Sequence, residues 1–94
     1  MDVQEIKPSE SKIIINKCNL EHFDWEKLAK ELKKLKYISS DLATCTVYVR
    51  PERGSYIPIF FRYATPKDKD QKLVTASCRD KVLSNKLLEI LKSM

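Results

Sequence analysis

The sequence predicts one small α/β domain in which a strand, a helix, three strands and a second helix follow one another. Its 94 residues are enough for a single hydrophobic core. Two stretches carry apolar residues at the spacing of an amphipathic helix, and four others are rich in β-branched and aromatic residues. We therefore expect the element order βαβββα within residues 12–94, preceded by a flexible N-terminal tail at residues 1–11.

The first strand and the first helix have the clearest local signals. Residues 13–15 are three consecutive isoleucines without polar alternation, which is typical of an inner strand covered on both faces. Asp24 is placed to cap a helix over residues 25–37. The apolar stripe of this helix consists of Trp25, Leu28, Leu32 and Leu35.

The second half of the chain predicts three strands and a closing helix. Residues 44–50 and 56–63 alternate between apolar and polar positions, and a short apolar run follows at 73–78. Residues 65–72 predict a charged turn. Asp80 is placed to cap the last helix, whose apolar side consists of Leu83, Leu87, Ile90, Leu91 and Met94.

The inner first strand favours a four-stranded mixed sheet with the helices packed on it. A strand, a helix and a second strand in succession predict a right-handed crossover between two parallel strands. With the first strand inside, the predicted strand order is 2-1-3-4. If residues 51–55 instead close a simple hairpin, the second and third strands become neighbours and the order becomes 1-2-3-4.

Composition excludes several classes of function. The single histidine, His22, leaves no His/Cys metal set and no Ser/His/Asp triad, so we expect no catalytic residues, no metal and no cofactor. Three cysteines without a CxxC spacing argue against a disulfide scaffold. No apolar run approaches the roughly 20 residues of a membrane span. The net charge of +5 favours anionic partners.

Basic residues near two strands and at the end of the first helix are the candidate partner-binding residues. Guanidinium groups pair bidentately with carboxylates and phosphates, and we expect the arginines to converge at one edge of the sheet. The candidates are Arg50, Arg53, Arg62, Tyr63, Lys33, Lys34 and Lys36. The aromatic residues interleaved with these arginines either stack on RNA bases or pack on the sheet, and they are Tyr48, Tyr56, Phe60 and Tyr63.

The stretch from residue 53 to 63, followed by a charged turn and residues 71–74, resembles the part of the thioredoxin fold in which a cis-proline precedes the third strand. Pro58 matches that proline. The CxxC pair of thioredoxins is absent from the region before the first helix. The resemblance implies a reduced thioredoxin-like fold without the redox pair.

Within that fold, residues 12–94 resemble a mitochondrial family that includes the small accessory subunit of respiratory complex I and several mitoribosomal proteins. The resemblance is carried by Cys18, Val49-Arg50-Pro51, Arg62-Tyr63 and the last helix. It implies a non-catalytic structural subunit, first of complex I (NADH:ubiquinone oxidoreductase), with protein subunits as partners and no small-molecule substrate. It also implies the mitochondrial matrix, although the N-terminus does not resemble a cleavable presequence. The cytoplasm is the alternative.

Two other functions remain open from the sequence. One is a mitoribosomal protein or a small RNA-binding module, which the net positive charge and the aromatic residues favour. The other is a monothiol oxidoreductase that uses the Cys18 thiol, placed between the first strand and the first helix.

Overall fold

The computed structural model describes residues 1–7, 11–33, 37–41, 45–50 and 55–94. Within these residues, one six-stranded sheet has the order β1-β2-β6-β5-β4-β3, and all neighbouring strands are antiparallel. Its strands are β1 (Val3–Lys7), β2 (Lys12–Ile15), β3 (Tyr37–Asp41), β4 (Thr46–Val49), β5 (Ile57–Tyr63) and β6 (Val74–Ser77).

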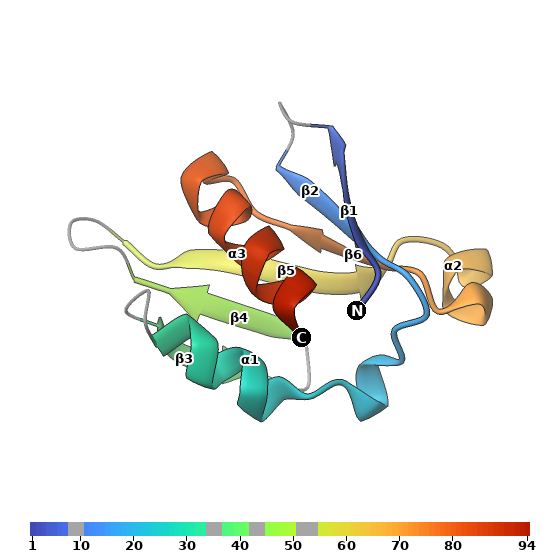
Figure 1. Cartoon of the computed structure of the whole chain (residues 1–94), viewed down its shortest axis with the longest axis horizontal. Coiled ribbons are helices and arrows are strands. Elements are labelled where there is room, and N and C mark those ends of the chain that lie inside the picture. Colours follow the sequence, from blue (N-terminus) through green and yellow to red (C-terminus); the bar gives the residue numbers. More distant parts are fainter. Residues whose placement is uncertain (8–10, 34–36, 42–44, 51–54) are drawn as a thin grey trace.

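Two helices cover one face of this sheet. Helix α1 (Trp25–Leu32) and helix α3 (Lys81–Ser93) lie on the same side of the strands and contact each other, whereas the short helix α2 (Pro66–Gln71) lies beyond the end of β5 (Figure 1). A 3-10 turn, η1 (Leu20–His22), precedes α1. Among the described helices, none is both long and apolar enough to cross a membrane.

Both predicted helix caps are confirmed. The Asp24 side chain accepts a hydrogen bond from the Lys27 N–H at 2.9 Å, and that of Asp80 accepts one from the Leu83 N–H at 2.9 Å. Each carboxylate thereby satisfies one of the backbone donors that a helix N-terminus leaves without a partner.

The core lies between the two helices and the sheet. The alternation predicted for β5 is confirmed. Ile59 and Phe61 are buried, whereas the residues that follow each of them, Phe60 and Arg62, are exposed. The buried apolar side chains are Ile13, Ile15, Cys18, Phe23, Leu28, Leu32, Val47, Val49, Ile59, Phe61, Val74, Ala76, Cys78, Leu83, Leu87 and Leu91.

The predicted sheet is wrong in strand number, order and direction. The four predicted strands correspond to β2, β4, β5 and β6, which lie in the order β2-β6-β5-β4. Neither 2-1-3-4 nor 1-2-3-4 matches, although β4 and β5 are neighbours as the hairpin alternative requires. The described strands contain no parallel pair, and the described peptide bonds, including that before Pro58, are not cis. The inner position of residues 13–15 is confirmed, since β2 lies between β1 and β6.

Three local predictions also differ from the structure. Residues 3–7, expected in a flexible tail, form β1 and pair with β2. The first helix ends at Leu32 instead of 37, and Tyr37–Asp41 form β3 beside β4. The predicted turn at 65–72 contains helix α2, which begins because Pro66 is preorganised for the first helical position and the Thr65 hydroxyl accepts a hydrogen bond from the Asp68 N–H.

Among the described residues, four other than glycine have a left-handed backbone conformation. Their φ angles are 52° at Ser11, 57° at Lys17, 50° at Cys45 and 56° at Lys72. A side chain crowds the backbone in this region, which costs roughly 1–2 kcal/mol per residue. Lys72 takes this conformation as the C-cap of α2, where its N–H bonds back to carbonyls of the helix.

Candidate functional site

The face of the sheet opposite α1 and α3 is the candidate functional site, and we call it the open face (Figure 1). Because side chains alternate along a strand, the residues between the buried positions project to this side. On the inner strands they are Lys12, Ile14, Thr46, Tyr48, Pro58, Phe60, Arg62, Thr75 and Ser77, of which Thr46 alone is buried. Arg50 and Tyr56 continue the rows of β4 and β5 just beyond the strand ends.

A row of apolar side chains runs along β5 on the open face. Tyr56, Pro58 and Phe60 occupy alternate positions, and Tyr48 on β4 is the direct cross-strand neighbour of Pro58. Tyr56 is 47% exposed and Phe60 is 45% exposed, which makes them two of the most exposed large apolar side chains among the described residues. Grouped apolar exposure of this kind marks a contact surface more often than a chance arrangement does.

Positively charged side chains surround this row. The Arg50 guanidinium carbon lies 5.9 Å from the centroid of the Tyr56 ring, within the range of a cation–π contact. Arg62 is exposed at the other end of the row. The four inner strands β2, β6, β5 and β4 contain no aspartate or glutamate. The centre of the open face is therefore apolar and its charged positions on these strands are basic.

A hollow of about 370 Å³ opens beside Phe60. Its lining residues are Lys12, Pro58, Phe60, Ser77, Cys78 and Arg79. Pro58 and Phe60 provide apolar walls, the Ser77 hydroxyl provides a hydrogen-bonding group, and the two basic side chains provide positive charge. This combination suits a flat ligand that carries negative charge at its edge.

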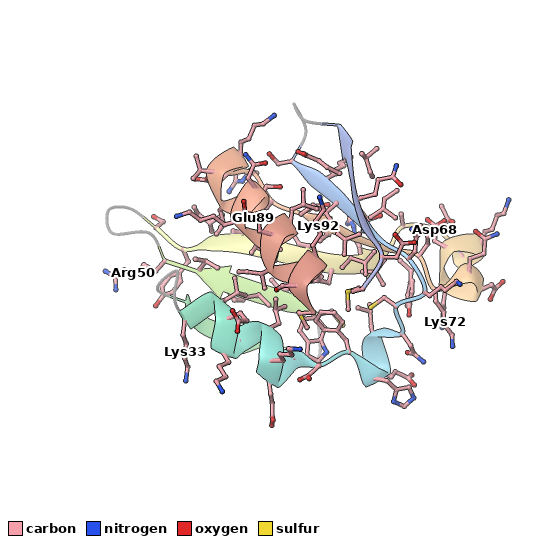
Figure 2. The ribbon with its side chains drawn as sticks, in the orientation of Figure 1. Lys33, Arg50, Asp68, Lys72, Glu89 and Lys92 are labelled. Carbon is pink, nitrogen blue, oxygen red and sulfur yellow. The ribbon has the colours of Figure 1, made fainter. Side chains whose placement is uncertain are left out.

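The predicted convergence is wrong for Arg50 and Arg62. Arg50 follows Val49, whose register partner is Ile57, so Arg50 lies at the beginning of β5 while Arg62 lies near its end. Six residues of extended strand separate these two positions along β5, and this separation corresponds to roughly 20 Å. Figure 2 shows Arg50 at the end of the molecule opposite to Lys72, the residue that follows α2.

Of the other basic candidates, only Lys33 falls within the described residues. Lys33 is exposed at the C-terminal end of α1, on the helix-covered side of the sheet (Figure 2). Arg53, Lys34 and Lys36 lie outside the described residues.

Tyr63 belongs to the helix-covered side and has a structural role. Its hydroxyl donates a hydrogen bond to the Cys18 carbonyl and accepts one from the Leu20 N–H, both at 3.1 Å. The half-buried ring thereby fixes the connection between β2 and α1. The same connection packs on an aromatic cluster in which the Trp25 ring lies 5.3 Å from that of Phe61.

The thiols of Cys18 and Cys78 are in environments that disfavour the reactive thiolate. Cys18 is buried, and this burial raises its pKa to about 11. Burial also raises the pKa of Cys78, whose sulfur lies 3.5 Å from the Asp80 carbonyl oxygen. Within the part of the chain that the structure describes, no three His, Cys, Asp or Glu side chains gather as a metal-binding group.

Lys12 and Arg79 are the residues that sequence reasoning missed. Lys12 begins β2, and Arg79 follows β6 at the turn into α3. The sequence shows that both adjoin strands, but only the pairing of β2 with β6 brings them to the same hollow.

The chain matches no protein-family model, no curated protein and no solved structure.

Proposed function

We propose that this protein is a non-catalytic binding subunit that contacts a macromolecular partner through the open face. One observation carries the proposal: Phe60 and Tyr56 are each nearly half exposed on the sheet face opposite α1 and α3, whose inner strands carry basic and no acidic residues. Removing these rings from water favours association. The surrounding cations select partners with negative charge.

The thiol chemistry supports a binding role over a monothiol oxidoreductase. Such an enzyme needs a thiol pKa below the ordinary value, because the thiolate is the nucleophile. The pKa of Cys18 is displaced in the opposite direction by burial, to about 11, so the thiol stays protonated at neutral pH.

The proposal keeps the accessory role that the sequence suggested and names no particular assembly. Respiratory complex I and the mitochondrial matrix remain predictions from the family resemblance carried by Cys18, Val49-Arg50-Pro51 and Arg62-Tyr63. The described strands differ from the predicted 2-1-3-4 order and pair only in antiparallel fashion.

A site-specific cross-linking experiment tests this function. A diazirine-bearing amino acid, which reacts with protein and nucleic acid alike, replaces Phe60 on the open face or Val82 on α3. Val82 is the matched control because it is 65% exposed and lies on the helix-covered side. We expect cross-linked adducts in cells to be several-fold more abundant from position 60. Equal yields from both positions, or none from position 60, would refute the open face as the contact surface.

A further inference from the structure

We propose that the ligand of the open face is single-stranded nucleic acid, with a base stacked on Phe60 in the hollow and phosphates bound by the surrounding cations. This inference rests on the proposed function, since it names the partner of the same surface. It follows from the chemistry of the aromatic row, from the placement of the cations and from the shape of the face.

The aromatic row provides stacking surfaces. Phe60 and Tyr48 are diagonal neighbours across β4 and β5, because Phe60 pairs with Thr46 and Tyr48 pairs with Pro58. Diagonal neighbours in an antiparallel pair lie about 7–8 Å apart. Rings at this spacing on an open sheet suit consecutive unstacked bases, each of which has a flat face to pack on an aromatic side chain.

The cations are placed for a chain of phosphates instead of one bound anion. Lys12 and Arg79 line the hollow in which the base would stack. Arg62 and Arg50 lie at opposite ends of the row, roughly 20 Å apart along β5. A polyanion crossing the face meets positive charge at the start, the middle and the end of its path. The Arg50 guanidinium, already over the Tyr56 ring, offers a further flat cation for stacking.

The shape of the face favours nucleic acid over an acidic peptide. A peptide that binds a sheet commonly adds a strand at an edge, where backbone groups are unpaired. The aromatic and basic side chains of the open face instead project from the inner strands β2, β4 and β5, and Arg79 follows β6. A ligand on this face therefore meets side chains and not unpaired backbone groups. These side chains can stack on bases and pair with phosphates.

Fluorescence anisotropy with labelled 12-nucleotide oligo(U) RNA and oligo(dT) DNA tests the inference on the full chain. We expect saturable binding at 50 mM salt that weakens as salt increases, because each phosphate contact releases counterions. Base–aromatic stacking is worth about 1–3 kcal/mol, so Phe60→Ala should weaken binding roughly 5- to 150-fold. Val82→Ala, at an exposed apolar position on α3, should leave the affinity unchanged.

A second pair of variants tests the cations. Arg79→Gln should reduce the slope of log K against log salt by about 0.7, the contribution of one phosphate contact on a single strand. Lys86→Gln is the control because Lys86 is exposed on α3, on the other side of the sheet. Circular dichroism confirms that each variant is folded before its affinity is measured.

Four results would overturn the inference: no binding of either oligonucleotide at 50 mM salt, an unchanged affinity in Phe60→Ala, equal affinity for duplex RNA of the same length, or tighter binding of a polyglutamate peptide. If cross-links from position 60 persist while the oligonucleotides do not bind, the open face is a contact surface for another class of partner. If cross-links from position 60 are also missing, the proposed function fails with the inference.

Discussion

At the scale of single residues, the Tyr63 hydroxyl joins two residues more than 40 positions away in sequence, through its bonds to the Cys18 carbonyl and the Leu20 N–H. Both groups are in the connection that leads from β2 to α1, outside the hydrogen-bonding ladder of the sheet. The hydroxyl therefore satisfies backbone groups that the secondary structure leaves without partners.

Tyr63→Phe removes this hydroxyl and keeps the ring. We expect the free energy of unfolding to fall by about 1–3 kcal/mol, the cost of leaving partly buried polar groups unsatisfied. Urea denaturation measures the change. Tyr56→Phe is the matched control, because Tyr56 is 47% exposed and water can replace its hydroxyl contacts. Equal stabilities of Tyr63→Phe and the wild type would show that the two hydrogen bonds contribute nothing.

At the scale of secondary-structure elements, α3 depends on its first turn as well as on its buried side. Asp80 accepts a hydrogen bond from the Leu83 N–H, and Leu83, Leu87 and Leu91 are buried against the sheet. The cap fixes where the helix begins, and the leucines fix which side it buries.

Asp80→Ala should destabilise the protein by about 0.5–2 kcal/mol, the range measured for loss of an N-cap side chain. Asp80→Asn should recover most of this loss, because asparagine also caps helices well. Thermal unfolding followed by circular dichroism compares the three proteins. An asparagine variant as unstable as the alanine variant would show that the charge, and not the capping bond, stabilises the helix.

Elements with local signals were predictable from sequence, and elements set by distant pairing were not. Asp24 and Asp80 with their apolar stripes located the beginnings of α1 and α3. Residue 37, the predicted end of the first helix, instead begins the strand Tyr37–Asp41, whose extended form depends on pairing with β4. Residues 3–7 carry little apolar pattern, and their strand exists because β2 offers an antiparallel partner.

The candidate site also combines features that local sequence predicts with features that depend on distant strand pairing. The sequence predicts Arg50 and Arg62 as candidate binding residues, and alternation along the strands places them on one face. Their separation along β5 follows from strand register, which the sequence does not specify. The hollow beside Phe60 also needs the β2–β6 pairing, because Lys12 and Ser77 come from strands distant in the chain.

At the scale of the whole molecule, one hydrophobic cluster connects both helices to the sheet. Leu28 of α1, Leu87 of α3 and Phe61 of β5 are all fully or almost fully buried in it. The aromatic cluster of Phe23, Trp25 and Phe61 borders the same core. Because the core is continuous, we expect the chain to unfold as a single cooperative unit.

The variant Leu87→Ala tests whether the chain unfolds as a single cooperative unit. Leu87 is fully buried, so its truncation should cost about 2–5 kcal/mol. In a single unit, the urea midpoint should shift equally when measured by Trp25 fluorescence and by far-ultraviolet circular dichroism. Leu88→Ala is the control, because Leu88 is only partly buried and should shift the midpoint less. Separate midpoints for the two signals would show that α3 unfolds independently of the aromatic cluster.

The left-handed conformations at Lys17 and Lys72 have a consequence for protein engineering. The sequence has one glycine in 94 residues, so these tight bends are made with residues that carry side chains. Glycine would adopt the same angles without steric cost, which at each position relieves up to about 1 kcal/mol. Since both lysines are exposed, thermostable versions of the protein could begin at these two bends and leave the core packing and the strands of the open face as they are.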